Sequence, residues 1–360
     1  MEKKKVYVTL ENGNVFQGYR FGGKGNVSGE LVFSTGMVGY VETLTDPESY
    51  GKIVVQTFPL VGNYGVMRSD METKKVWASA FIVREACENP SNFRMEESLE
   101  AFMETENVVG VYGVDTRQLT KILREEGAMN ARISDKPLTE NELSALKGYK
   151  TENAVDAVAP TEKTTYESKA AKYTVALWNF GVKRTQIESL VAKGCTVISM
   201  PAQSTAEEVL SIKADGVIVA GGAGDPADCD AYVAEIKKIL GKTPVFGIEF
   251  GHLLLARAFG AQTKKQKHGH RGANQPVKCV TCGKVYISAQ NHGYVVASES
   301  VKNGFIKFVS VNDGSCEGIE YADFNAFGVQ FSPDSCSATG LENPLYKKFF
   351  EMMRKEKEHA

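Results

Sequence analysis

The sequence predicts an α/β protein in which an N-terminal α+β domain precedes a domain built on a doubly wound, mostly parallel sheet. Three observations support this. At roughly 150 residues per domain, 360 residues favour two domains. The first half opens with strand-like segments followed by helices, whereas the second half alternates apolar strands with helices. Residues 149–172 lack periodicity, which predicts a linker between domains at 1–148 and 173–360.

The N-terminal domain is expected to begin with strands and continue with two helices. Asn12-Gly13 is a strong hairpin signal between two of these strands. β-branched and aromatic runs predict strands at 6–10, 15–16, 31–33 and 76–83. One helix is expected over about 95–106, and a second from Asp115, which forms a capping pair with Gln118, to a C-cap at Gly127.

The C-terminal domain is expected to be a parallel sheet, because its apolar runs are nearly continuous. These strands are predicted at 174–178, 196–200, 216–220 and 244–248. One helix is expected at 183–193, and Ser204 with Glu207 forms an expected capping box for the next. Ligands bind at the carboxyl ends of such strands, so the loops after Ala220 and Ile248 are the expected places for chemistry.

Two glycine-rich loops lie at those strand ends. Gly247-Ile248-Glu249-Phe250-Gly251 has the form of a strand–turn–helix elbow, which exposes its central side chain at a helix N-terminus. Gly221-Gly222-Ala223-Gly224 offers backbone N–H groups to an anion. The alternative for both is an ordinary tight turn, with Glu249 facing solvent.

A metal site is not expected. His268 and His270 precede Cys279 and Cys282, but this spacing is not a standard zinc pattern. We expect instead a basic loop around the two histidines that packs on a partner.

Composition excludes several classes of function. The chain has 42 basic and 44 acidic side chains, which argues against a broad nucleic-acid surface. It shows no signal peptide or membrane span, and its 7 cysteines are odd in number and mostly far apart. We therefore expect a cytoplasmic protein with free thiols and no nucleic-acid or membrane partner.

Many motifs in order resemble the small subunit of glutamine-dependent carbamoyl phosphate synthetase. In the N-terminal half the resemblance lies in residues 29–40, 43–47, 62–65, 91–94 and 114–117. In the C-terminal half it lies in 180–184, 224–226, 269–274 and 290–294. The resemblance implies that the second domain is a class I glutamine amidotransferase domain.

The family hydrolyses glutamine with a Cys–His–Glu arrangement and passes ammonia to a large subunit, which makes carbamoyl phosphate. The resemblance therefore implies the large subunit as partner, and a link to arginine or pyrimidine biosynthesis. ATP and Mg²⁺ would belong to the large subunit, so no cofactor is expected in this chain.

The sequence departs from the family at the residues that carry this chemistry. The three positions of the family's triad are Glu249, Ser332 and Asp334. Leu253 stands where a glutamine contacts substrate, and Glu48, or Ser49 with a one-residue slip, where a serine is expected. By resemblance, the ligand-binding positions are Gly222, Gly224, Phe250, Leu253, Asn291, Gly293, Tyr294 and Glu48.

These departures predict a subunit that has lost glutamine hydrolysis and supports an ammonia-using synthetase, with Arg117 and Arg271 as anchors for the partner. One alternative is a stand-alone regulatory protein that binds glutamine or a related small molecule. A second is an ordinary glutamine-hydrolysing subunit. For the motifs at 29–40, 115–117 and 269–274, the alternative role is to hold the protein's own domains together.

Overall fold

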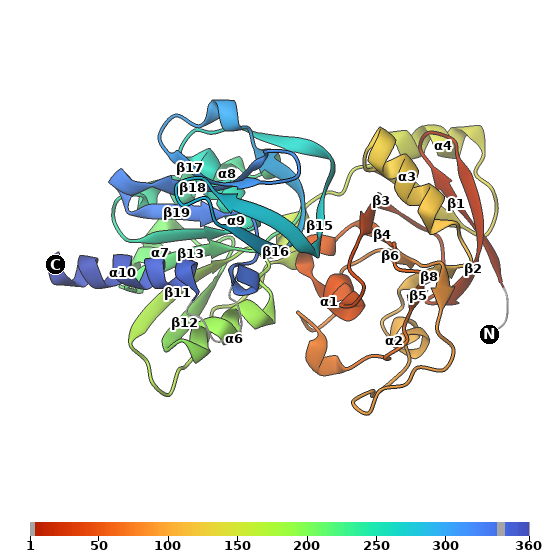
Figure 1. The fold of residues 1–360 in the computed structure, drawn as a ribbon, viewed down its shortest axis with the longest axis horizontal. Coiled ribbons are helices and arrows are strands. Elements are labelled where there is room, and N and C mark those ends of the chain that lie inside the picture. The colour runs from red at the N-terminus through yellow and green to blue at the C-terminus, as the bar shows by residue number, and fades with distance from the viewer. Residues whose placement is uncertain (1–3, 337–342, 360) are drawn as a thin grey trace. The chain divides into compact units, whose positions relative to one another are not determined.

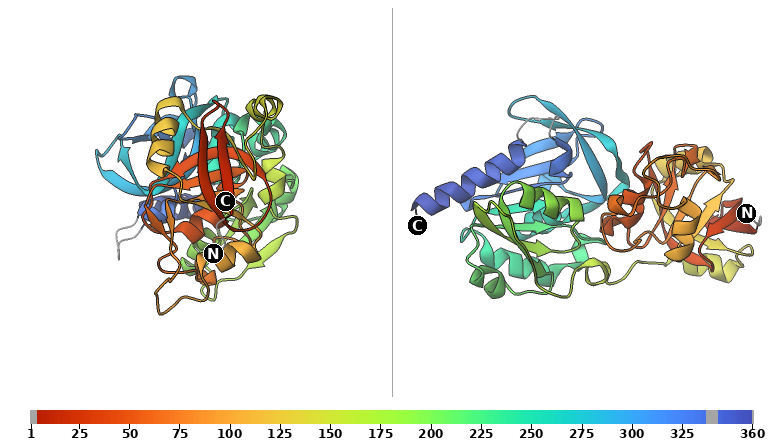
Figure 2. Two further views of the ribbon diagram at one scale, coloured as in Figure 1. Left: turned by 90° about the vertical axis from the view of Figure 1, so that its right-hand side faces the viewer. Right: turned by 90° about the horizontal axis from the view of Figure 1, so that it is seen from below.

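The computed structural model describes residues 4–336 and 343–359 of the chain (Figure 1). The chain divides into two compact units, residues 1–152 and 153–360. Figure 2 shows the elements of each unit from two further directions. Among the helices of the described residues, none combines the length and the apolar composition that crossing a membrane requires.

Strands of the first unit form a closed barrel. In barrel order they are β1 (Lys5–Leu10), β2 (Val15–Gly22), β8 (Val109–Tyr112), β6 (Ala80–Ile82), β4 (Lys52–Gln56), β3 (Val27–Ser34) and β9 (Met129–Ser134). The expected hairpin turn joins β1 and β2, and Gly13 there has a φ of 91°, which glycine adopts without steric cost. The side chains of Val6, Val8 and Leu10 alternate along β1 and are fully buried in the barrel core.

Short helices accompany the barrel strands. They are α1 (Tyr40–Thr45), α2 (Leu99–Thr105), α3 (Thr116–Glu126) and α4 (Glu140–Lys147). The start of α3 confirms the predicted cap, because the Gln118 amide donates to Asp115 Oδ1 at 3.0 Å. Gly127 is its C-cap, as expected. Leu119 and Leu123 of α3 are fully buried in the barrel core, which fixes this helix against the strands.

A ten-stranded sheet organises the second unit. Its parallel part is formed, in order, by β12 (Cys195–Pro201), β11 (Tyr173–Asn179), β13 (Gly216–Ala220), β14 (Val245–Ile248) and β19 (Ala326–Val329). Antiparallel strands extend it with β10 (Thr164–Tyr166) beside β12, and with β18 (Cys316–Tyr321), β17 (Phe305–Ser310), β15 (Thr263–Cys279) and β16 (Val285–Val296) beyond β19. The apolar runs predicted the first four parallel strands; the antiparallel extension was not predicted.

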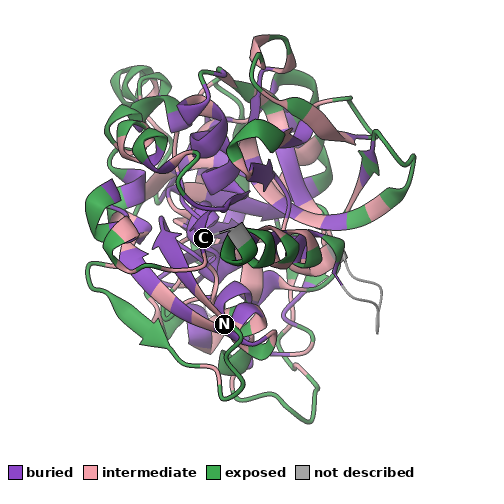
Figure 3. Cartoon of the chain, turned by 90° about the vertical axis from the view of Figure 1, so that its left-hand side faces the viewer, coloured by how far each residue is buried: buried purple, intermediate pink, exposed green. Residues whose placement is uncertain are grey.

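Helices cover both faces of the parallel strands, which makes the sheet doubly wound. One apolar core includes side chains of α7 (Ala206–Ser211), α8 (Asp230–Ile239) and α9 (Phe250–Ala258). The other includes side chains of α6 (Arg184–Ala192) and α10 (Pro344–His359). Figure 3 shows buried strands between helices whose outer faces are exposed. The carboxyl ends of the parallel strands therefore meet at one edge, where the elbow lies.

Some expected elements are shorter than predicted. The strand predicted at 76–83 is confined to β6, because the residue before it, Ser79, bends and Ala78 forms only an isolated bridge with Tyr50. The helix predicted from residue 95 begins at Leu99, where the Ser98 side chain accepts the Ala101 amide at 3.2 Å and caps the helix.

The capping box predicted at Ser204 and Glu207 is wrong by one residue. Thr205 is the N-cap and Glu208 its partner, since the Glu208 amide donates to Thr205 Oγ1 at 3.2 Å. The segment 149–172 also contains regular structure, namely α5 (Ala154–Val158) and β10. Val155 of α5 belongs to a core of the second unit, so this part of the segment is packed.

Candidate functional site

The elbow between β14 and α9 has the strand–turn–helix geometry that the sequence predicts. Glu249 stands between the two elements with φ 57° and ψ −121°, a combination that non-glycine residues rarely adopt. A Cβ on Gly251 would lie 2.0 Å from the Val219 carbonyl oxygen, so only glycine fits the start of α9. The close packing of α9 on β13 stabilises this strained backbone conformation of Glu249.

The Glu249 carboxylate is buried and paired, which excludes the alternative of a solvent-facing glutamate. Its side chain is only 3% exposed. Lys183 Nζ lies 2.5 Å from Oε1, and Gln186 Nε2 donates to Oε2 at 3.0 Å. Lys183 is itself 13% exposed, so both charges of this ion pair are largely removed from water.

Asp334 is bound by residues on and next to helix α6, the helix that also carries Gln186. Ser189 Oγ donates to Asp334 Oδ1 at 2.5 Å, and the Lys193 ammonium lies 3.6 Å from that oxygen. The hydroxyl of Tyr346 on α10 donates to Oδ2 at 3.0 Å. Burial raises the pKa of Tyr346 well above its usual value, so its hydroxyl stays protonated and can donate.

Four residues on α6 or next to its ends contact Glu249 or Asp334. We call them the polar stripe: Lys183, Gln186, Ser189 and Lys193. They are spaced three or four residues apart, which places them on one face of the helix. The stripe binds Glu249 and Asp334, two of the three substituted triad positions. No sequence pattern indicated this stripe, although Lys183 lies within the motif at 180–184 that carries the family resemblance.

Ser332 lies at the same edge of the sheet. The carbonyl of Val329, the last residue of β19, accepts the Glu249 amide at 2.9 Å, and Ser332 follows three residues later. The Ser332 amide donates to the Ala289 carbonyl of β16 at 3.0 Å. The fold thus brings all three triad positions to one edge of the sheet, but a serine and two carboxylates occupy them.

The predicted ligand positions of the second unit lie in three places. Gly222 lies against the Phe250 ring, since a Cβ there would be 2.3 Å from Phe250 Cδ1. Phe250 and Leu253 are buried within an apolar core. Asn291, Gly293 and Tyr294 lie together on β16. A Cβ on Gly224 would lie 2.7 Å from the Cβ of Ala154.

Glu48 belongs to the first unit, within the short 3₁₀ helix Pro47–Ser49. Its amide donates to Asp46 Oδ1 at 2.9 Å, and its side chain is buried. Ser49, the alternative position, donates its hydroxyl to the Thr43 carbonyl at 2.6 Å. Both residues are therefore fixed by contacts within the first unit.

His270 and His292 face each other across β15 and β16, with ring centroids 5.1 Å apart. His270 Nδ1 lies 3.0 Å from Glu317 Oε1, and its Nε2 lies 3.0 Å from Asp313 Oδ2. His292 Nε2 lies 3.0 Å from Gln290 Oε1, and its Nδ1 lies 3.0 Å from the Tyr294 carbonyl. No sequence pattern indicated this network, because its members are far apart in the chain.

The network does not fit a metal ion. Ligand atoms of His270, His292 and Glu317 lie within 4.8 Å of one another, but each ring nitrogen already has a hydrogen-bond partner. Burial lowers the pKa of His292 well below its usual value, which keeps this ring neutral. Burial also lowers the pKa of His270, but the Glu317 and Asp313 carboxylates outweigh that effect and raise it. The hydrogen bonds of both rings, and the ion pairs that His270 can form with Glu317 and Asp313, account for the cluster without a metal.

The two predicted anchor residues differ in exposure. Arg271 is buried and donates from Nη1 to the His268 carbonyl at 2.6 Å, so within this chain it fixes the strand; its role as a partner anchor stays a prediction. The basic loop predicted around His268 and His270 is part of strand β15. Arg117 is exposed on α3, and it lines a cavity of about 960 Å³ together with Arg84, Lys121 and Arg124.

Comparison with known proteins identifies the family. The domain family described as carbamoyl-phosphate synthase small chain, CPSase domain, matches residues 8–133, and glutamine amidotransferase class-I matches residues 176–352. The carbamoyl phosphate synthase small chain of Clostridium perfringens is 44% identical, over 96% of this chain and 99% of its own. That of Bacillus thuringiensis is 42% identical, over 99% and 98%.

A third relative is the pyrimidine-specific small chain of Bacillus subtilis, which is 40% identical over 97% of this chain and 96% of its own length. These matches cover both units of the fold and nearly the full length of each relative. The chain therefore belongs to the family of carbamoyl phosphate synthase small chains.

Proposed function

We propose that this chain is a small subunit that no longer hydrolyses glutamine and that supports a large synthetase subunit working on free ammonia. The observation that carries the proposal is the buried ion pair between Glu249 and Lys183 at the elbow. In a hydrolytic member, this position holds the cysteine that attacks the substrate carbonyl.

The chemistry of amide hydrolysis supports the proposal. The step needs a nucleophile and a base that accepts and later donates its proton. A carboxylate would have to form an acyl anhydride from an amide, and Glu249 is already bound by an ammonium and an amide donor. Ser332 cannot act as a base near neutral pH, and Asp334 is bound by Ser189 and Tyr346. Because triad members act as a unit, the loss of several leaves little catalysis.

The first unit supports the role of a partner subunit. It carries the motifs at 29–40 and 115–117, none of which supplies a triad residue. Arg117, Arg84, Lys121 and Arg124 line one cavity of this unit, and together they make it basic. A basic surface of this kind suits an acidic partner surface. No cofactor is proposed for this chain, since ATP and Mg²⁺ would be bound by the large subunit.

The direct test is glutamate release by the purified chain. We expect no release of glutamate above a buffer control. Glutamine turnover that disappears in Glu249→Ala would contradict the proposal and would make Glu249 a catalytic residue.

The test of the partner role mixes the chain with the large synthetase subunit of the same cell. We expect a stable complex and faster carbamoyl phosphate formation from ammonia, with no activity from glutamine. The paired change Arg117→Glu and Lys121→Glu should weaken the complex, whereas Lys136→Glu, an exposed lysine that does not line the basic cavity, is the matched control. If the subunits never associate and the ammonia-dependent rate is unchanged, the partner role fails and a stand-alone binding protein becomes the better explanation.

A further inference from the structure

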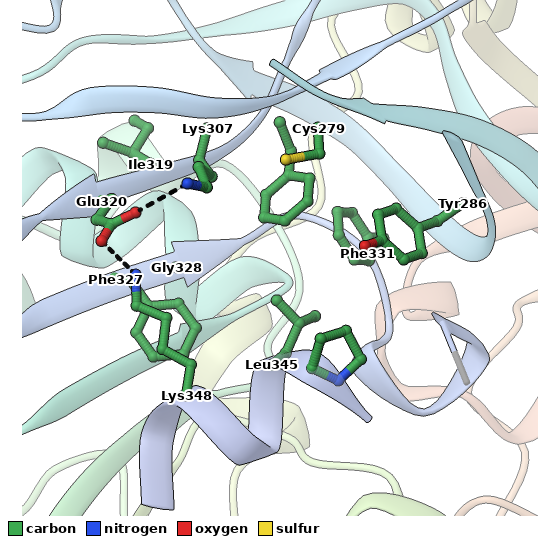
Figure 4. A pocket seen from close by; sticks show the side chains of 12 residues that line it. Cys279, Tyr286, Lys307, Ile319, Glu320, Phe327, Gly328, Phe331, Leu345 and Lys348 are labelled. Atoms are coloured by element: carbon green, nitrogen blue, oxygen red, sulfur yellow. Dashed lines mark ion pairs between the residues drawn. The ribbon is translucent and has the colours of Figure 1, made fainter. Parts of the chain in front are cut away.

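A cavity of about 170 Å³ lies in the second unit, between the antiparallel strands and the start of α10 (Figure 4). The strand register places its wall residues on one face of the sheet, because Cys279 pairs with Phe308 and Glu320 pairs with Phe327. Leu345 of α10 lines the cavity from the side of the helix. The cavity is therefore enclosed by elements of one unit.

Aromatic side chains form most of the apolar wall. The rings of Phe308 and Phe331 meet edge to face with centroids 5.6 Å apart, and those of Tyr286 and Phe308 do so at 6.3 Å. Edge-to-face contacts of this kind are favourable, so the wall is already ordered. An apolar cavity of about 150 Å³ stays dry and binds one benzene molecule. This cavity thus has the size and the surface to hold a single six-membered ring.

Three charged side chains lie together at one end of the cavity. Figure 4 shows Lys307, Glu320 and Lys348 on one side of it, and Tyr286 and Phe331 on the other. Lys348 Nζ lies 2.5 Å from Glu320 Oε1, and Lys307 Nζ lies 3.7 Å from Oε2. The three side chains are 27–33% exposed, so this end is open to solvent.

The charges at this end do not cancel. Burial raises the pKa of Glu320, but the ammonium groups of Lys348 and Lys307 outweigh that effect and lower it, so the carboxylate stays ionised at neutral pH. Two ammonium groups and one carboxylate leave a net charge of about +1. The two ammonium groups together also carry more N–H donors than one carboxylate can accept. A second carboxylate would therefore find both charge and donors here.

We propose that this cavity binds a small organic anion composed of one aromatic ring and one carboxylate group. The ring would occupy the space beside Phe308 and Phe331, and the carboxylate would face Lys307 and Lys348. The volume admits one ring, the apolar wall favours it, and the net positive charge at the open end favours a single negative charge on the ligand.

The site is separate from the elbow. None of the residues that line the cavity is a triad position or a member of the polar stripe. Phe331 does immediately precede Ser332, so a bound ring would lie beside that segment. The inference is independent of the proposed function, since binding can be measured whether or not the chain hydrolyses glutamine.

The test titrates the full, reduced chain with benzoate in a calorimeter. We expect one site with a dissociation constant in about the millimolar range, because the ligand is small. Benzamide, which has the ring without the charge, should bind about fivefold more weakly, the factor that a partly exposed ion pair contributes. Acetate, which has the charge without the ring, should not bind. Benzoate should also slow the alkylation of Cys279, which lines the cavity, but not that of Cys87 in the first unit.

Substitutions locate the site. Glu320→Gln removes the competing carboxylate, so benzoate should bind more tightly and benzamide as before, whereas Lys307→Gln should reduce benzoate binding to the level of benzamide. Lys355→Gln, an exposed lysine of α10 outside the cavity, is the matched control and should change neither.

Leu345→Phe places an additional ring in the cavity and should weaken both ligands, with the denaturant midpoint as the check on folding. The proposal is overturned if benzoate does not bind at millimolar concentrations, if benzamide or acetate binds as tightly, or if Glu320→Gln and Leu345→Phe both bind benzoate as the unchanged chain does.

Discussion

The ion pair between Lys183 and Glu249 should make a large and measurable contribution to the stability of the second unit. We consider the change Lys183→Met, which keeps much of the side chain's length but removes its charge. The Glu249 side chain is 3% exposed, so its carboxylate would remain buried without its counter-ion, although the Gln186 amide would still donate to Oε2. A buried charge that has lost its counter-ion is strongly destabilising.

The geometry sets the magnitude. Breaking a buried pair costs about 3–5 kcal/mol, whereas exposed pairs contribute about 0–1 kcal/mol. Because Gln186 still donates to Oε2, we expect a loss near the lower limit, about 3 kcal/mol at neutral pH. Removing both charges, in Lys183→Met with Glu249→Gln, should recover much of this loss, since no unpaired charge remains.

The assay is denaturant unfolding followed by tryptophan fluorescence. The chain has two tryptophans, and Trp178 is fully buried in the second unit, so a Trp77→Phe background makes fluorescence report that unit. The double-mutant cycle should give a coupling energy of at least about 2 kcal/mol. Arg184 and Glu188 form an exposed pair on the same helix, with side chains 41% and 58% exposed, and serve as the control. Additive effects for the buried pair, equal to those of the exposed pair, would refute the argument.

Three further outcomes are expected. Glu249→Gly should be more stable than Glu249→Ala by about 1–3 kcal/mol, because glycine relieves the strain at φ 57°; equal unfolding midpoints would contradict this. Burial lowers the pKa of His252 to about 3, and neither ring nitrogen has a hydrogen-bond partner among the described residues. Below about pH 6.5 the unfolded state therefore binds a proton at His252 that the folded state does not bind. This lowers the stability of the folded state by up to about 1.4 kcal/mol per pH unit between pH 6 and 4, and His252→Leu should abolish this loss in acid titrations. Gly251→Ala should unfold the second unit at a much lower denaturant concentration, since its Cβ would lie 2.0 Å from the Val219 carbonyl oxygen, whereas Gly148→Ala, with 3.7 Å to its nearest atom, should change little.

Local signals in the sequence were sufficient for the elements that local physics controls. Strand β13 has the predicted bounds, Gly216–Ala220, because its apolar run is uninterrupted. Asp115 and Gly127 limit α3 as predicted, because a capping side chain and a C-cap glycine act over a few residues. The capping box was misplaced by one residue, since Ser204 and Thr205 are adjacent and both are good N-caps.

Contacts between distant segments could not be predicted in this way. Strand β15 begins Thr263-Lys264-Lys265-Gln266-Lys267, a polar run without alternation, and it is a strand because β16 pairs with it. Lys183 is 66 residues from Glu249, so no spacing rule connects them. The elbow sequence predicts the position of Glu249, but it does not predict that its side chain is buried and bound by residues of α6.

The pairing at the elbow also determines what a single reversion would do. Glu249→Cys places a thiol on a shorter side chain near the Lys183 ammonium that now contacts the carboxylate, and a neighbouring cation lowers a thiol pKa. We expect the pKa of this thiol to be lower than in a Lys183→Met background, so that its alkylation should set in at a lower pH when Lys183 is present.

A reactive thiol at position 249 is nevertheless not sufficient for glutamine hydrolysis. Ser332 cannot take the role of the family's histidine, which serves as base and as proton donor to the departing ammonia, so glutamate release should stay at the background level. Adding Ser332→His, Asp334→Glu and Leu253→Gln to Glu249→Cys supplies the base, its orienting carboxylate and the substrate-contacting amide, and has the better prospect of turnover. Robust glutamine hydrolysis by Glu249→Cys alone would show that Ser332 and Asp334 do not limit the reaction and that the side chain at position 249 alone separates this subunit from a hydrolytic one.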